Sequence, residues 1–199
     1  MLHPHIWLII FWILFGVSHS LLASIWFKNQ IRMLAGRSFK YYRIIYNLFS
    51  FLSLGLILYF QYSFSSPALW VSPYWITLPA FLFVALGGLI MLICITRYFL
   101  PMSGLSALRN KNEDSFLVID GMHRFVRHPL YFGTLMLVWA LFLIYPFLNN
   151  LICCTAITLY TFLGTVMEEK KLLIQFGNEY RKYQREVPML VPFTKFARQ

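Results

Sequence analysis

One stretch of this sequence gathers residue types that bind anions. Proline suits the first turn of a helix and disfavours helical angles in the residue before it, so His128 and Pro129 predict a helix that starts at Pro129. The free amides at a helix start attract an anion, and Arg124 and Arg127 stand just before them. Gly121 permits a tight bend ahead of these residues. The stretch predicts a pocket for a carboxylate or phosphate, although arginines that only anchor the chain at lipid phosphates would give a similar pattern.

A second stretch places two carboxylates where a long apolar run ends. Glu168 and Glu169 follow this run directly, and an ionisable residue at such a depth is a functional candidate because its removal from water is costly. They accept a proton, bind a cationic ligand, or pair with Arg124 or Arg127, and the sequence leaves these three roles open. The apolar residues that follow recur at three- and four-residue intervals and indicate an amphipathic helix: Leu172, Leu173, Phe176, Tyr180 and Tyr183.

A single histidine lies inside the first apolar run. His19 is flanked by Ser18 and Ser20 and precedes Lys28 by roughly two to three turns of helix. A lone histidine in a membrane helix often forms hydrogen bonds to a neighbouring helix. Its position near the same side as the two stretches above also makes it a candidate wall of the same site, and the sequence does not decide between these roles.

Long apolar runs must position these residues. Of the 199 residues, 59% are hydrophobic and 12% are charged, whereas a soluble domain carries about 25% charged residues. A helix that spans a bilayer needs about 20 mostly apolar residues. We therefore expect an all-α integral membrane protein with a single domain, 1–199, and a C-terminal amphipathic helix. Two segments, 117–131 and 168–192, would form the site. About five spans are expected, at 5–27, 42–62, 74–95, 129–147 and 151–167.

The three cysteines lie inside apolar runs, which favours packing over a metal site or a disulfide framework: Cys94, Cys153 and Cys154.

The charged residues are confined to three segments. All 17 Lys and Arg and all 7 Asp and Glu lie within 28–43, 97–127 and 168–199. Five spans place these segments on one side of the membrane, and basic residues mark the cytoplasmic side. The N-terminus is then outside and the C-terminus in the cytosol of a multi-pass protein of the inner membrane. Because topology and anionic lipid account for the net charge of +10, we expect no nucleic-acid partner, and the oligomeric state stays open.

The motifs in both stretches resemble the isoprenylcysteine carboxyl methyltransferase and phospholipid methyltransferase superfamily. The resemblance rests on Gly121, His123, Arg127, His128, Pro129, Tyr131 and Gly133, then on Glu168, Glu169, Leu172, Phe176, Gly177, Tyr180 and Tyr183, and on Val187, Pro188 and Pro192. The N-terminal part is similar to the bacterial branch, which includes thiol S-methyltransferases and small membrane proteins linked to nitrogen-oxide metabolism. That similarity rests on Gly16, His19 to Ala23, Tyr42, Arg43, Tyr46 and Asn47.

The resemblance implies S-adenosylmethionine bound between the loop before the fourth span and the C-terminal helices. It implies cofactor contacts from His128, Tyr131, Glu168 and Glu169, with Leu117 and Gly121 shaping the loop. His123 stands where the family commonly has tyrosine, so the contact there differs. The carboxylate of the cofactor would suit Arg124 or Arg127, and its sulfonium would suit carboxylates and aromatic faces, which are offered by Glu168, Tyr131 and Tyr180.

These inferences favour a membrane-embedded S-adenosylmethionine-dependent methyltransferase. The acceptor would be a small thiol, a lipid amine or a prenylated carboxylate delivered from the bilayer or its cytosolic surface, with Arg127 and Glu168 steering it. Methyl transfer is a direct displacement that needs alignment and exclusion of water but no covalent nucleophile. Two alternatives stay open. One is a haem-binding protein, an isomerase or a nitrogen-oxide-related protein, with His19 and either His123 or His128 on the iron. The other is a non-catalytic subunit whose basic face binds lipid or a protein partner.

Overall fold

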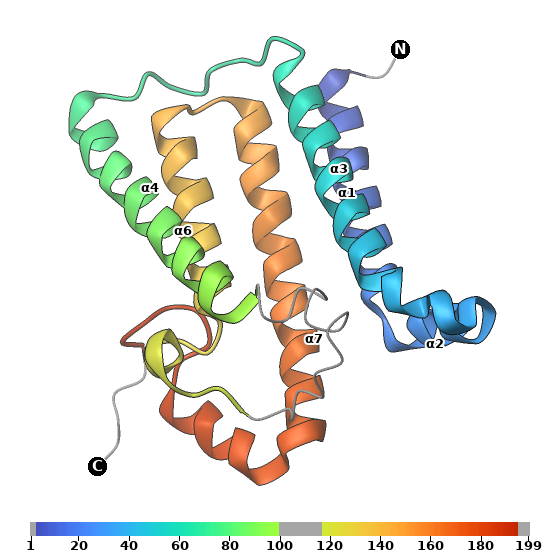
Figure 1. The fold of residues 1–199 in the computed structure, drawn as a ribbon. Helices are drawn as coiled ribbons and strands as arrows, with labels where there is room; N and C mark the ends of the chain where they lie inside the picture. Colours follow the sequence, from blue (N-terminus) through green and yellow to red (C-terminus); the bar gives the residue numbers. More distant parts are fainter. Residues whose placement is uncertain (1–2, 100–116, 195–199) are drawn as a thin grey trace.

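The regular elements of the described chain are helices, apart from one isolated β-bridge between Ala68 and Phe147. The computed structural model describes residues 3–99 and 117–194 (Figure 1). The elements are α1 (Pro4–Ala23), α2 (Ile25–Ala35), η1 (Gly36–Tyr41), α3 (Tyr42–Tyr62), α4 (Tyr74–Cys94), η2 (Ile95–Phe99), η4 (Gly121–Arg124), α6 (Pro129–Ile144) and α7 (Leu148–Glu186). The all-α prediction is confirmed. The charged residues of the sequence between 100 and 116 lie outside the described residues.

The helices have the length and surface of membrane spans. Four runs are long and apolar enough to cross a bilayer: Pro4–Ala23, Ile25–Tyr62, Tyr74–Arg97 and Leu148–Glu186. Large apolar side chains such as Ile13, Leu14 and Val17 are more than half exposed, which suits contact with lipid. The protein is therefore an integral membrane protein. The predicted fourth span corresponds to α6, whose 16 residues measure about 24 Å, less than the roughly 30 Å hydrocarbon core.

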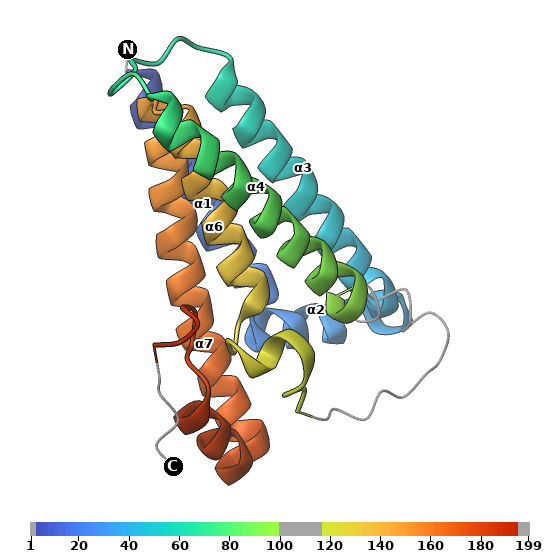
Figure 2. The same cartoon turned by 90° about the vertical axis from the view of Figure 1, so that its left-hand side faces the viewer.

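Two predicted boundaries differ from the structure. The first helix ends at Ala23 rather than at residue 27, because Ser24 leaves helical angles (φ −68, ψ 148) and accepts a hydrogen bond from the Phe27 amide to start α2. The predicted amphipathic helix does not start as a separate element at Glu168, because α7 continues from Leu148 through Glu168 as far as Gly177. At Gly177 the backbone leaves helical angles, and a second arm of α7 follows to Glu186. Figures 1 and 2 show α7 projecting well past the other helices before this bend.

Close packing of α4 on α6 holds the start of α6 in place. Added to Gly87, a Cβ would lie 2.8 Å from the Gly133 carbonyl oxygen, and one added to Gly133 would lie 2.8 Å from Ile90 Cγ2. The two backbones therefore touch through small residues, the usual way in which membrane helices approach closely. The described charged segments lie at one end of the bundle, which we call the charged end (Figure 1). It comprises α2, η1, the first turn of α3, η2, η4 with the loop to α6, and the part of α7 from Glu168 onward.

We expect replacement of Gly177 by alanine to destabilise the charged end. Gly177 has φ 54 and ψ −121, a region that only glycine adopts without strain, and a Cβ there would meet no atom within 4 Å. The loss should be roughly 1–3 kcal/mol, measured as thermal unfolding in detergent. Gly55→Ala is the matched control, because Gly55 lies inside α3 with equally open surroundings, and it should stabilise the protein by up to about 1 kcal/mol. Equal effects of both changes would contradict this account.

Candidate functional site

The loop before α6 has the backbone that its sequence predicts. Gly121 has φ 59 and starts the turn η4. His128 has φ −125 and ψ 69, outside the helical region, and α6 starts at Pro129. Both local predictions are confirmed. This path of the backbone places Arg127 and His128 against Glu169 of α7.

The end of the chain folds back onto this loop after Gly177. The amide of Arg127 donates to the Pro188 carbonyl at 2.9 Å, and the amide of His128 donates to the Met189 carbonyl at 3.2 Å. Leu117 packs against the buried cluster of Tyr180, Tyr183 and Val187. The hydroxyl of Tyr183 donates to the His123 carbonyl at 2.6 Å. The two predicted segments therefore form one unit.

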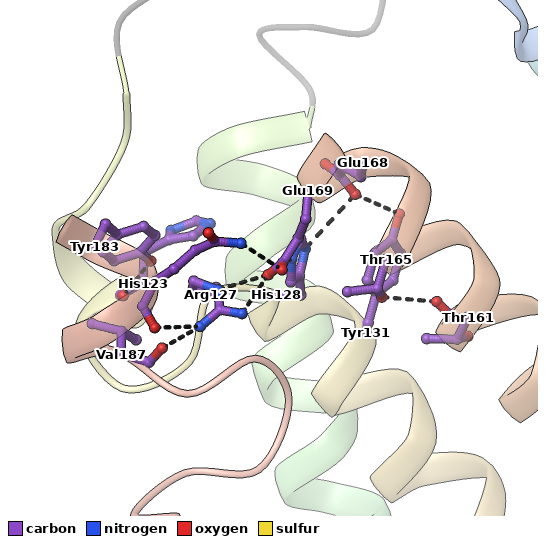
Figure 3. A network of polar contacts seen from close by, with 11 residues as sticks. His123, Arg127, His128, Tyr131, Thr161, Thr165, Glu168, Glu169, Tyr183 and Val187 are labelled. Atoms are coloured by element: carbon purple, nitrogen blue, oxygen red, sulfur yellow. Dashed lines mark hydrogen bonds and ion pairs between the residues drawn. The ribbon is translucent and has the colours of Figure 1, made fainter. Parts of the chain in front are cut away.

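Arg127 joins the loop to both arms of the bent helix α7 (Figure 3). Its Nε and Nη2 contact Glu169 Oε1 at 2.7 and 2.6 Å, and Nη1 donates to the carbonyls of Gln184 and Val187. The Arg127 side chain is 6% exposed and that of Glu169 is 13% exposed. We expected Arg127 to steer the acceptor, but the structure directs all these donors inward, so its contacts are those of a positioning residue.

Glu169 is held as a carboxylate despite its burial. Burial raises its pKa, but hydrogen bonds from His128 and Arg127, the charge of Arg127 and a hydrogen bond from Gln184 lower that pKa to about 2. His128 Nε2 lies 3.2 Å from Glu169 Oε1, and Gln184 Nε2 donates to Oε2 at 2.9 Å. Both oxygens of Glu169 are thus occupied by protein groups.

The lowered pKa of Glu169 predicts a specific loss of stability in acid. Its folded pKa lies below the ordinary value of 4.5, so the charged form stabilises the fold fully above that value. The stabilisation, on the order of 3 kcal/mol, is lost as pH falls toward the folded pKa of about 2. The check is thermal unfolding of wild type and Glu169→Gln in detergent from pH 6 to pH 2. Their difference should be largest above pH 4.5 and shrink in acid, and a constant difference would contradict the prediction.

Glu168 occupies a different environment from its neighbour. Its side chain is 47% exposed, and Oε2 accepts a hydrogen bond from the Tyr131 hydroxyl at 3.1 Å and lies 3.7 Å from His128 Nδ1. The rings of His128 and Tyr131 stack at 5.7 Å between centroids and 17° between planes. Oriented but not enclosed, the Glu168 carboxylate is available to a ligand that carries a positive charge.

The remaining predicted residues divide into buried and exposed groups. Tyr180 is buried beside the Arg127–Glu169 pair. Burial and the nearby Glu169 raise the pKa of Tyr180. Burial and the adjacent His128 lower the pKa of His123 against an opposing effect of Asp120. Arg124 is exposed.

Two features of the site escaped the sequence analysis. One is the pair of carbonyl groups on Gln184 and Val187 that accept from Arg127; the only signal for them is Gly177, which allows the chain to return. The other is the surroundings of His19. Its Nδ1 lies 2.5 Å from the Tyr160 hydroxyl and its Nε2 lies 2.7 Å from the Tyr46 hydroxyl.

These contacts bear on the haem alternative. Both ring nitrogens of His19 are engaged by tyrosine hydroxyls, and those of His128 lie against Glu168 and Glu169. Iron would have to displace these partners. Within residues 3–99 and 117–194, no group of three or more His, Cys, Asp or Glu is arranged to hold a metal ion.

Comparison with known proteins gives the family. A family model described as NnrU protein matches residues 7–196, nearly the whole chain. The chain belongs to the NnrU family. The similarity to methyltransferases that the motifs indicate is confirmed by individual relatives, and no solved structure matches this NnrU-family chain.

The relatives are named as methyltransferases and are longer than this chain. Methanethiol S-methyltransferase 1 of Bradyrhizobium diazoefficiens is 37% identical over 76 residues, which is 37% of this chain and 25% of that protein. Methanethiol S-methyltransferase of Pseudomonas deceptionensis is 40% identical over 91 residues, 44% of this chain and 33% of that protein. Human protein-S-isoprenylcysteine O-methyltransferase is 29% identical over 133 residues, 61% of this chain and 46% of that protein. The matched part spans less than half of each relative.

Proposed function

We propose that this chain is a membrane-embedded methyltransferase that binds S-adenosylmethionine at the charged end and methylates a small thiol. The observation that carries the proposal is the contrast between two adjacent carboxylates. Glu169 is neutralised by Arg127, whereas Glu168 is half exposed and is oriented by Tyr131 and His128. Neighbouring carboxylates in such different surroundings have different roles, and the accessible one matches a cationic cofactor.

The residues present fit S-adenosylmethionine, which supplies a methyl group on a positively charged sulfur. Glu168 offers acceptor oxygens to the ammonium or the ribose hydroxyls, and the ring of Tyr131 offers an aromatic face to a cation. Between these residues and the membrane core lies Gly164, where a Cβ would meet no atom within 4 Å. Arg127 and Glu169 position the loop, and His128 orients Glu168 and Tyr131.

The acceptor and the orientation belong to the same proposal. The relatives are named for methylation of methanethiol and of isoprenylcysteine, and we place the small thiol first because the stronger matches carry that name. Because basic residues mark the cytoplasmic side of the inner membrane, the charged end faces the cytosol, where the cofactor would enter.

The test uses the full chain purified in lipid nanodiscs. We expect saturable binding of radiolabelled S-adenosylmethionine in equilibrium dialysis. Label from the methyl group should pass to ethanethiol and benzyl thiol more efficiently than to the carboxylate of N-acetyl-S-farnesylcysteine. Preferred transfer to the farnesylated compound would replace the thiol by a prenylated acceptor. Absence of saturable binding at millimolar cofactor would overturn the proposal.

A further inference from the structure

A histidine between two tyrosines lies inside the bundle, on three different helices. His19 on α1 contacts Tyr160 on α7 through Nδ1 and Tyr46 on α3 through Nε2, at 2.5 and 2.7 Å. A neutral imidazole has one N–H donor and one acceptor nitrogen, and each hydroxyl can donate or accept. The row Tyr46–His19–Tyr160 can therefore take up a proton at one end and redistribute it along the row.

This row faces the proposed cofactor site along one side of α7. Tyr160, Gly164 and Glu168 recur every four residues and so share a face of the helix. Open space lies over Gly164, whereas Gly16 of α1 allows close approach to Tyr160, because a Cβ there would lie 3.3 Å from that ring. The Tyr131 hydroxyl donates to Glu168 at the other end of this face. The space over Gly164 thus separates a carboxylate side from a histidine side.

A pocket leads to the histidine side from the lipid-facing surface. It has a volume of about 390 Å³ and lies between α1 and α3, lined by Ser18, Leu21, Leu22, Tyr42, Ile45, Tyr46 and Phe49. Ile45 is 63% exposed, so the pocket opens where the bilayer would be. Tyr46 lines the pocket and contacts His19. An apolar molecule in the pocket would meet the row directly.

We propose that the acceptor enters through this pocket and that His19, flanked by Tyr46 and Tyr160, takes its proton. This inference rests on the proposed function. A thiol crosses the bilayer in its neutral form, whereas the thiolate is the nucleophile. A base at the inner end of an apolar pocket resolves this conflict, because the charge is created only beside the cofactor.

The step balances as follows. The S–H bond of the thiol breaks and its proton enters the row at the Tyr46 hydroxyl, which passes its own proton to His19 Nε2. The sulfur electron pair forms the new bond to the methyl carbon. The bond from this carbon to the sulfonium breaks, and its electron pair stays on the departing sulfur, which becomes a neutral thioether. The positive charge of the sulfonium is thereby replaced by that of the imidazolium between the two hydroxyls.

The first experiment compares thiols of different acidity. We expect His19→Gln in nanodiscs to bind labelled S-adenosylmethionine with an affinity within about twofold of wild type. It should methylate benzyl thiol roughly 100-fold more slowly, the usual contribution of a general base, but methylate thiophenol, which ionises without help near neutral pH, within a few-fold of wild type. Tyr46→Phe should show a weaker form of this pattern. His5→Gln, a buried histidine at the other end of α1, is the matched control and should change neither rate.

The second experiment tests the pocket without any cofactor. Saturation-transfer NMR should detect binding of benzyl methyl sulfide, the expected product, to wild type and to Leu52→Trp but not to Ile45→Trp. Leu52 lies two turns from Ile45 on the same exposed side of α3 and does not line the pocket. Equal slowing of both thiols by His19→Gln, or unchanged sulfide binding to Ile45→Trp, would overturn this inference and leave the proposed function standing. A wild type that binds no cofactor would overturn both.

Discussion

Replacing Arg127 by alanine should detach the loop before α6 from α7 and abolish cofactor binding. The change leaves Glu169, only 13% exposed, as a buried charge without its main partner, and such a loss costs roughly 3–5 kcal/mol. It also removes the donors to the Gln184 and Val187 carbonyls. Thermal unfolding in detergent should show a large drop in the midpoint, and equilibrium dialysis should show no saturable S-adenosylmethionine binding.

Arg124→Ala is the matched control for this prediction. Arg124 lies three residues away in the same loop and is exposed, so its loss should shift stability by less than about 0.5 kcal/mol. The double variant Arg127→Met with Glu169→Leu separates stability from function. This double variant should recover part of the lost stability, because apolar replacement of a buried ion pair is often neutral. It should orient His128 less well, because Glu169 no longer contacts the His128 ring. An Arg127→Ala protein as stable as Arg124→Ala would contradict the assignment of Arg127 as the link.

Backbone features set by neighbouring residues could be predicted from the sequence. The bend at Gly121, the non-helical angles of His128 and the helix start at Pro129 depend on sterics within two or three residues. The apolar runs likewise predict the helices, because their length is set by the bilayer. The continuity of α7 could not be predicted in this way. The change from apolar to charged residues at Glu168 marks the end of the apolar run, but nothing there breaks a helix.

Contacts between distant segments could not be read from the sequence. Arg127 was expected to face a ligand, yet its acceptors come from carbonyls 57 and 60 residues later and depend on the return of the chain at Gly177. The partners of His19 lie 27 and 141 residues away, on helices α3 and α7. In both cases the residue type predicts that the side chain forms hydrogen bonds. The identity of its partner depends on how the helices pack, which the sequence does not give. The carboxylate pair shows the same limit, because only the fold distinguishes Glu168 from Glu169.

Replacing Glu168 by glutamine should weaken S-adenosylmethionine binding about 10- to 100-fold while leaving the fold intact. A charge-assisted hydrogen bond is worth roughly 1.5–3 kcal/mol, and each 1.4 kcal/mol is tenfold in affinity. Because the Arg127–Glu169 contact does not involve Glu168, the unfolding midpoint should match that of wild type. Equilibrium dialysis with labelled cofactor measures the first quantity and thermal unfolding the second. Glu179→Gln, an exposed acid on the same helix, should change neither.

The split between KM and kcat then decides what Glu168 contacts. A carboxylate that holds the ammonium or ribose of the cofactor stabilises the bound cofactor and the transition state equally, so its loss raises KM for S-adenosylmethionine and leaves kcat within a few-fold. A carboxylate that steers the acceptor would instead lower kcat with little change in cofactor affinity. We expect the first outcome, since the Glu168 side chain is oriented by Tyr131 and His128 of the loop and of α6, whereas we place the acceptor beside His19. Wild-type affinity in Glu168→Gln would remove this residue from the cofactor site.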